Sequence, residues 1–139
     1  MEISRCHRPA GHWDWPIPLP YSMGVKLDGL VMVGGQVALD EEGRVLHPGD
    51  IAAQARICMD YLGRVLTSLG AAFQDVIKVN TFYVGHGTQE DWEEAARIRA
   101  EYFPEPGPIA TGIPVPALAY EGLMIEIEAV AVNGGAACQ

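Results

Sequence analysis

The sequence predicts one α/β (α+β) domain in which a six-stranded mixed sheet carries two helices on one face. Strand-like and helix-like patterns follow one another in the order β-β-β-α-β-α-β-β. Two helices are too few to cover both faces of six strands, so the other face needs solvent or a partner. The chain has 139 residues, 49% of them hydrophobic, which suits a single domain spanning residues 1–139 with its own core.

The first 19 residues are predicted to form an irregular strap. Between His12 and Pro20, aromatic residues alternate with prolines, which excludes a helix. A flexible tail is one interpretation of this segment. Trp13 and Trp15 instead favour a strap that packs onto the body of the protein or onto a neighbour.

Three strands are expected next, and the turn between the first two is the clearest signal. Asp28-Gly29 is a strong hairpin dipeptide because both turn positions favour positive φ. Gly34-Gly35-Gln36 separates this hairpin from a short third strand. The expected strands span residues 22–27, 30–33 and 37–39.

A long helix is predicted over residues 50–69. Asp50 is suited to the N-cap, and Gly70 to the left-handed position that follows the last turn. Apolar residues recur at spacings of three and four, as in a helix buried along one face. They are Ile51, Ala55, Cys58, Met59, Leu62, Val65, Leu66 and Leu69. Cys58 on this stripe is interpreted as a small core residue and not as a nucleophile.

The C-terminal half alternates between strands and a second helix. A strand over residues 76–84 leads through a loop that contains His86 to a helix beginning at Thr88, in a sequence that resembles a capping box. The proline-rich residues 104–108 end this helix. Strands are expected at residues 109–115 and 123–132, followed by a frayed tail at 133–139.

The last strand places two carboxylates on the face of the sheet without helices. Alternation turns Glu126 and Glu128 away from the helices, roughly 7 Å apart. On the preceding long strand, Val76, Lys78 and Asn80 are expected to share that face. From spacing alone, a solvated Lys–Glu pair is the simpler interpretation. The more specific interpretation is that the apolar residues around the carboxylates are buried against other subunits. One carboxylate would then lie in a cleft and have a shifted pKa.

Composition and charge argue against several classes of protein. Nine basic residues against eighteen acidic ones give a formal net charge of −9, and the basic residues are scattered, which disfavours nucleic-acid binding. No apolar run approaches the roughly 20 residues of a membrane span, and the N-terminus lacks a secretory signal. Neither the cysteines nor the histidines have metal-ligand spacing. We therefore expect a cytoplasmic protein with no metal site and no membrane or nucleic-acid partner.

Five short segments together carry a resemblance to a known family. They are Pro20-Tyr21-Ser22, Gly34-Gly35-Gln36-Val37, Gln54, Asp75-Val76-Ile77-Lys78 and Ile125-Glu126-Ile127-Glu128-Ala129. In order and spacing they resemble the Rid family (YjgF/RidA type), also called the L-PSP endoribonuclease family. The resemblance implies a chorismate-mutase-like fold and a homotrimer with clefts between subunits. It also implies hydrolysis of reactive enamines and imines to a ketone and ammonia, without metal or cofactor.

The resemblance implies roles for three residues. Glu126 matches the glutamate that positions or activates the attacking water, Tyr21 matches a tyrosine of the cleft, and Gly35 matches a glycine whose backbone contacts substrate. An imine carbon is already electrophilic, so a carboxylate that holds one water suffices. From the residues alone, a structural pairing of Glu126 with Lys78 stays open, as does a simple interface role for Tyr21.

The sequence departs from the family where its deaminases hold the substrate carboxylate. The family's arginine, in a Pro-Ala-Arg-Ser/Thr stretch, aligns with Ala110, its nearby cysteine with Gly112, and a frequent helix asparagine with Ala96. Without that bidentate arginine, a 2-imino acid would enter a cleft with a carboxylate and no counter-charge. Arg97 or Arg99 would supply one only by turning in from the second helix, whereas exposed helix cations are the simpler interpretation.

These observations favour a hydrolase for a small imine, enamine or related C–N compound that lacks the usual carboxylate. Glu126 would orient the water, and Ala110 would leave room for a neutral or bulkier group. The candidate substrate-binding residues are Tyr21, Gly35, Ala110 and Thr111, with His86 and Arg99 at the periphery. The alternative is a non-catalytic trimer that binds a small metabolite, and a ribonuclease is disfavoured by the acidic charge.

Overall fold

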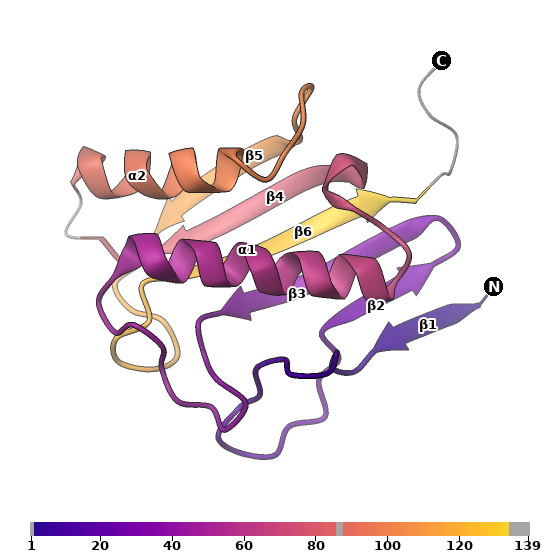
Figure 1. Cartoon of the computed structure of the whole chain (residues 1–139), viewed down its shortest axis with the longest axis horizontal. Coiled ribbons are helices and arrows are strands. Elements are labelled where there is room, and N and C mark those ends of the chain that lie inside the picture. Colours follow the sequence, from indigo (N-terminus) through magenta and orange to yellow (C-terminus); the bar gives the residue numbers. More distant parts are fainter. Residues whose placement is uncertain (1, 86–87, 134–139) are drawn as a thin grey trace.

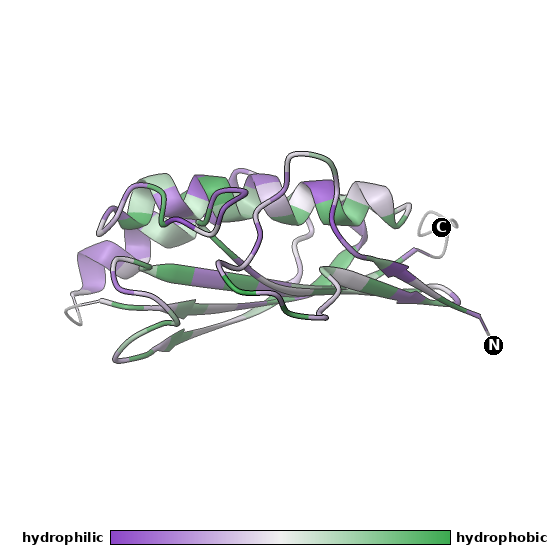
Figure 2. Ribbon diagram, turned by 90° about the horizontal axis from the view of Figure 1, so that it is seen from below, coloured by the Kyte–Doolittle hydropathy of each residue, from purple (hydrophilic) through white to green (hydrophobic). Residues whose placement is uncertain are grey.

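The computed structural model describes residues 2–85 and 88–133. Six strands form one sheet in the order β1-β2-β3-β6-β4-β5, and helices α1 (Ile51–Ser68) and α2 (Gln89–Ala100) lie on the same side of it (Figures 1 and 2). The strands are β1 (Ile3–Cys6), β2 (Gly24–Leu27), β3 (Leu30–Val37), β4 (Val76–Tyr83), β5 (Ile109–Pro114) and β6 (Ile125–Val132). Among these described strands, β4 and β5 pair in parallel and the other neighbours pair antiparallel. The predicted fold class and element order are confirmed.

The structure has one strand that was not expected and lacks one that was. Ile3–Cys6 forms β1, antiparallel to β2, within the segment expected to be irregular. Four residues are too short to show a clear alternation in the sequence. Residues 37–39 do not form a strand of their own, because Val37 ends β3 and Leu39 makes only an isolated bridge to Val45.

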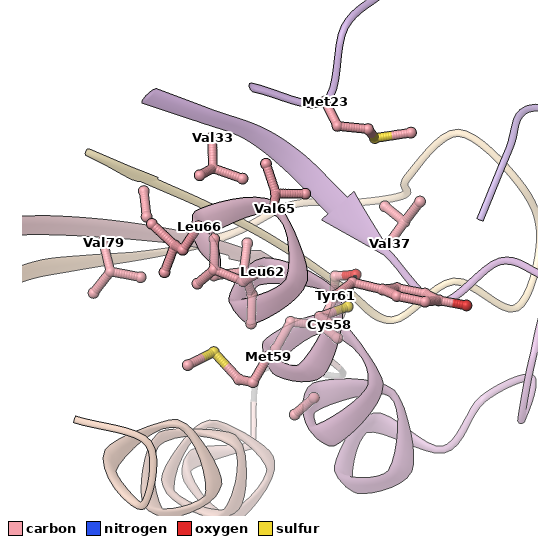
Figure 3. Close-up of a cluster of buried hydrophobic side chains, with 14 of the residues drawn as sticks. Met23, Val33, Val37, Cys58, Met59, Tyr61, Leu62, Val65, Leu66 and Val79 are labelled. Carbon is pink, nitrogen blue, oxygen red and sulfur yellow. Dashed lines mark hydrogen bonds between the residues drawn. The ribbon is translucent and has the colours of Figure 1, made fainter. Parts of the chain in front are cut away.

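The α1 helix forms and packs as its sequence predicts. The side chain of Asp50 accepts a hydrogen bond from the backbone N–H of Ala53 at 3.1 Å, and Gly70 has a left-handed φ of 78° after the last turn. All eight predicted core residues of this helix are buried. Figure 3 shows several of them, including Cys58 and Leu62, packed between α1 and the sheet. The interpretation of Cys58 as a core residue is confirmed.

Residues 12–15 pack onto the body of the protein as a strap. Trp13 is 1% exposed, and its indole N–H donates to Oε1 of Gln36 at 2.9 Å. His12 is also buried, and its Nε2 lies 2.7 Å from the same oxygen. Because Trp13 can only donate, this oxygen is an acceptor, so Nε2 of His12 carries the proton. The amide of Gln36 in turn donates to the carbonyl of Gly34 at 3.0 Å.

A shift of register in β3 turns Gln36 toward the strap and the helices. Val33 lies opposite Ala129 of β6, whereas Gln36 lies opposite Ile127, so three steps on β3 match two on β6. This β-bulge at Gly34-Gly35 places one extra residue in β3.

A second shift of register lies in β4, and it shows that the face predicted for Val76 is wrong. Val76 lies opposite the buried Ala131, whereas Lys78 lies opposite Val130 on the uncovered side. Val76 therefore does not share a face with Lys78 and Asn80. The reason is the irregularity between Val76 and Lys78, which resets the alternation of the strand.

We predict that His12 makes the fold sensitive to mild acid. Burial lowers the pKa of His12 below 6.5, with Arg64 and Arg8 acting in the same direction and the bond to Gln36 opposing them. A group with a depressed pKa contributes stability above its unfolded pKa and loses it as the pH falls. The free energy of unfolding in urea, measured from pH 7.5 to 5, should fall more steeply for the wild type than for His12→Phe.

The matched control for this experiment is His7→Gln, which removes an exposed histidine close in sequence. At pH 7.5 the His12→Phe variant should lose about 1 kcal/mol, because it gives up the bond to Gln36. Parallel pH curves for the wild type and His12→Phe would contradict the prediction.

Candidate functional site

The uncovered face of the sheet carries a group of polar side chains in the middle of its strands. Glu126 and Glu128 of β6 lie opposite Phe82 and Asn80 of β4. The amide of Asn80 donates to Oε1 of Glu128 at 3.2 Å. Within the described residues, no ion pair joins Lys78 to either glutamate. The structure thus does not show the Lys–Glu pair that was the simpler interpretation of the spacing.

Glu126 lies against the backbone of β3 at Gly35. A Cβ atom on Gly35 would stand 2.6 Å from Oε2 of Glu126 and 2.8 Å from its Cδ, closer than a real Cβ contact allows. Glycine at this position therefore leaves the space that the carboxylate occupies. The β3 bulge brings together two of the residues that the sequence proposed for the site, Gly35 and Glu126.

The carboxyl group of Glu126 has an unusual electrostatic environment. Burial raises its pKa, and the negative charge of Glu128 on the same face raises it further. No hydrogen bond or ion pair to Glu126 is present among residues 2–85 and 88–133. A carboxylate that lacks a protein partner and has a raised pKa is suited to hold a water molecule and to accept a proton from it.

Tyr21 lies close to Gly35, at the end of the strap. It is 59% exposed. Together with Trp15, Gly34 and Gly35 it lines a hollow of about 170 Å³. The structure therefore places Tyr21 and Gly35 at one hollow, with Glu126 packed directly against Gly35.

The register of β5 places two of the predicted site residues on opposite faces of the sheet. Ala110 pairs with Val79, which is buried under the helices, and Thr111 pairs with Asn80, which lies on the uncovered face. Paired residues of neighbouring strands point to the same side of a sheet. Ala110 therefore faces the helix side of the sheet within this chain, so its predicted role in a cleft between subunits stays a prediction. Thr111 faces the side of Glu126.

The two arginines of α2 differ in their surroundings. Arg97 is exposed, as expected for a helix cation. Arg99 is only 8% exposed, so the interpretation of an exposed cation is wrong for this residue. The sequence carries a signal for its burial, because Trp92, Ala96 and Arg99 follow the spacing of one helix face. His86 lies outside the described residues.

Gln54 is a positioning residue whose importance the helix pattern did not reveal. It is fully buried on α1, and its amide donates to the carbonyls of Leu46, His47 and Gly122 at 2.8–3.1 Å. Its Oε1 accepts the backbone N–H of Met124 at 2.7 Å. Gln54 thereby fixes the chain two residues before Glu126. A polar residue among buried helix positions is the signal that predicts such a role.

Within the described part of the chain, no group of three or more His, Cys, Asp or Glu side chains is arranged to hold a metal ion. None of the helices described is long and apolar enough to cross a membrane.

Comparison with known proteins shows consistent similarities. The sequence model of the family described as endoribonuclease L-PSP matches residues 17–133. The 3-aminoacrylate deaminase RutC of Acinetobacter baylyi is 38% identical over 120 residues, which cover 84% of this chain and 90% of that protein. The 2-iminobutanoate/2-iminopropanoate deaminase of Mus musculus is 32% identical over 115 residues, which cover 83% of this chain and 82% of that protein.

Solved structures show the same fold. A putative endoribonuclease from Thermotoga maritima matches with a TM-score of 0.78 and 26% identity, covering 93% of this chain and 97% of that one. The YjgF gene product of E. coli matches with a TM-score of 0.75 and 26% identity, covering 93% and 98% of the two chains.

We predict that Gly35→Ala displaces the carboxylate of Glu126. The new Cβ would overlap the carboxylate, which is the mobile end of its side chain and turns away. Burial of Glu126 then decreases, so its pKa should move down toward the ordinary value, as followed by carboxyl ¹³C NMR. The free energy of unfolding should fall by about 1 kcal/mol, the low end for an overpacked site.

Gly34→Ala is the matched control, because its Cβ would meet its nearest neighbour, the carbonyl oxygen of Met23, at an ordinary 3.5 Å. If both substitutions change the pKa of Glu126 equally, the prediction is wrong, because the close packing of Gly35 against this carboxylate would then not determine its pKa.

Proposed function

Because the chain belongs to the endoribonuclease L-PSP family, also called the YjgF/Rid family, we propose that it is a hydrolase that deaminates a small imine or enamine. Relatives named as deaminases of 3-aminoacrylate and of 2-iminobutanoate/2-iminopropanoate support this class of reaction. The observation in this chain that carries the proposal is the half-buried carboxylate of Glu126, which lies against Gly35 and has no hydrogen-bond or ion-pair partner in the described part of the chain.

The proposed reaction needs one activated water. A water oxygen held by Glu126 attacks the carbon of the C=N bond, the π electrons move to nitrogen, and Glu126 accepts a proton from the water. Glu126 passes this proton to the imine nitrogen, which gives a neutral carbinolamine. Glu126 then takes the proton of the carbinolamine hydroxyl and delivers it to nitrogen as the C=O bond forms, so the C–N bond breaks and its electron pair leaves with nitrogen. The products are a carbonyl compound and ammonia, so one imine and one water are consumed. An enamine first takes a proton on carbon and gives one up from nitrogen, which makes it the imine.

We also propose which residues would contact the substrate. Tyr21 and the backbone of Gly35 border one hollow next to Glu126 and would hold the substrate there. Thr111 lies on the edge strand β5, and we propose that its backbone contacts the substrate as well. We assign Ala110 no contact on this face, because it points toward the helices.

The composition of the uncovered face supports a homotrimer in which neighbouring subunits complete the site. Large apolar side chains remain exposed on the sheet at Met32, Ile109 and Ile113. An exposed apolar surface of this kind is typical of an interface between subunits. Burial of this surface would remove water from around Glu126, which strengthens its interactions with a bound imine.

The charges near Glu126 support a substrate without a carboxylate next to the imine. Thr111 is the polar side chain that β5 directs to this face, and it carries no charge. Lys78 lies on the same face, but it is far from Glu126. Phe82 is the residue of β4 opposite Glu126, and Lys78 lies four residues before it, roughly 13 Å along the strand. A 2-imino acid bound at Glu126 would thus face repulsion without compensation.

A trimer that only binds a small metabolite is the second candidate. The observation that favours it is that no cation lies beside Glu126 among the residues that the structure describes. Recovery of an unchanged ligand that stabilises the protein would distinguish it from the hydrolase. The net charge of −9 disfavours a ribonuclease.

We predict that Glu126→Gln lowers kcat for an uncharged imine by about 100-fold or more, the usual contribution of a general base. The imine can be generated in situ by an amine oxidase and scavenged by semicarbazide. Because the pKa of Glu126 is raised, kcat/KM of the wild type should decline on the acid side at a higher pH than the ordinary 4.5 of a glutamate.

Glu128→Gln is the control for this prediction. It should keep most of the activity, and its acid limb should move to lower pH, since the neighbouring negative charge that raises the pKa of Glu126 is gone. Equal activity of Glu126→Gln and the wild type would remove Glu126 from the mechanism.

We predict that Thr111→Arg increases hydrolysis of 2-iminopropionate relative to the uncharged imine by about 10-fold or more, because a guanidinium then shares the face of Glu126. Ala110→Arg is the matched control and should leave this ratio unchanged, since residue 110 points to the helices. A larger gain for Ala110→Arg would show that the substrate is bound from the helix side of β5.

A further inference from the structure

The strap that joins β1 to β2, residues 7–21, has few hydrogen bonds to the rest of the protein. In the described part of the chain, one backbone–backbone bond joins it to the body, from the N–H of Asp14 to the carbonyl of Asp40 at 3.1 Å. The side chain of Arg64 on α1 adds a bond to the carbonyl of Gly11 at 3.3 Å. A segment with so few bonds can open locally while the rest of a domain stays folded.

The main attachment of the strap is the pair of bonds to Gln36. Its Oε1 accepts from Nε2 of His12 and from Nε1 of Trp13, which occupies both lone pairs of an amide oxygen. His12 and Trp13 are 3% and 1% exposed. Among the described residues, Nδ1 of His12 is buried without a hydrogen-bond partner. A proton that binds there creates a buried cation whose new N–H has no acceptor, which is unfavourable.

The charged groups that face His12 oppose this cation. Arg64 faces it from α1, and Arg8 faces it from the strap itself. The uncharged ring of Tyr61, also on α1, lies 4.6 Å from the imidazole, measured between ring centroids. Burial lowers the pKa of His12 most strongly, and the two arginines lower it further, against the opposing effect of the bond from Gln36.

Carboxylates on the neighbouring segments are paired with other residues. Asp14 of the strap pairs with Arg8 at 2.6 Å, and Asp40, in the loop after β3, pairs with Arg44 at 3.1 Å. The residue of β3 that contacts His12 is Gln36, which carries no charge. Protonation of His12 therefore weakens the attachment of the strap and gains no ion pair with these carboxylates in return.

The same strap forms one wall of the hollow beside the candidate site. Trp15 and Tyr21 line this hollow of about 170 Å³ together with Gly35. The indole of Trp15 packs edge-on against Trp13, with ring centroids 5.0 Å apart. Movement of Trp13 out of its buried position would therefore move Trp15 as well and remove part of this wall.

We propose that protonation of His12 is a pH switch that releases the strap from Gln36 in mild acid and opens the hollow at Gly35. The sheet and α1 stay folded, because α1 packs directly on β3 and β6 and does not need the strap to hold these layers together. The release of the strap is independent of the proposed hydrolysis, whereas its effect on substrate binding rests on that proposed function.

Tryptophan fluorescence of the full-length protein tests the switch. Trp92→Phe provides a background in which the emission comes from Trp13 and Trp15 alone. From pH 7.5 to 5 this emission should shift reversibly to longer wavelength, because Trp13 becomes exposed, while far-UV circular dichroism stays constant. The ratio of released to attached strap should rise by up to about 10-fold for each pH unit below the ordinary histidine pKa of about 6.5, as expected for one proton.

His12→Gln, made in the same background, removes the titration and keeps an N–H donor for Gln36. Its emission should stay constant from pH 7.5 to 5. The matched control is His7→Gln, which removes an exposed histidine of the same strap. This variant should show the same acid shift as the background protein.

Hydrolysis of the uncharged imine provides a second measurement. When nine-tenths of the strap is released, KM of the wild type should be higher by about 10-fold, because only the remaining fraction keeps the wall of the hollow. KM of His12→Gln should change little over the same pH range. If no imine is hydrolysed but the emission shifts as expected, the proposed function is wrong and the switch is retained.

Three results would overturn the switch. One is an emission that stays constant down to pH 5 in the Trp92→Phe background. Another is an acid shift that persists in His12→Gln, since a different group would then control the strap. The third is emission and circular dichroism that change together, which would show that the strap separates only when the whole domain unfolds. This last comparison needs no substitution at residue 12, so it decides the matter even if His12→Gln does not fold.

Discussion

The extra residue in β3 at Gly34-Gly35 is the constraint on which both sides of the sheet depend. It turns Gln36 toward the helices, where its side-chain oxygen accepts bonds from His12 and Trp13. At the same place, the missing side chain of Gly35 leaves room for the carboxylate of Glu126. Without the bulge, strict alternation would move Gln36 to the uncovered face, and the strap would lose its attachment.

The candidate site is therefore held by groups that take no part in chemistry. Gln54 ties the start of β6 to α1 through the backbone of Met124. Gln36 ties the strap to β3 beside Gly35. Both amides are buried and fully bonded, so each fixes a backbone segment that a purely apolar core would leave free to shift. Glu126, by contrast, has no such partner among the described residues, and its burial costs stability that the surrounding packing must offset.

The sequence predicted the elements well because their signals are local. The cap at Asp50, the turn at Asp28 and the alternation of β6 each depend on a few neighbouring residues. The site was predicted only where a resemblance linked distant segments, as for Gly35 and Glu126. Bulges and registers are set by pairing between strands, so the face of Val76 and the side of β5 to which Ala110 points could not be derived from alternation. The burial of Arg99 likewise depends on where α2 lies over β5.

The position of β5 has a consequence for the colloidal behaviour of an isolated chain. It is an edge strand, all six of its residues are exposed, and two of them are isoleucines. Such an edge offers unpaired backbone groups to another molecule. At neutral pH the acidic net charge keeps copies of the chain apart. Near the isoelectric point of about 4.7 that repulsion vanishes, so acid exposes the protein to precipitation through this edge as well as to loss of fold.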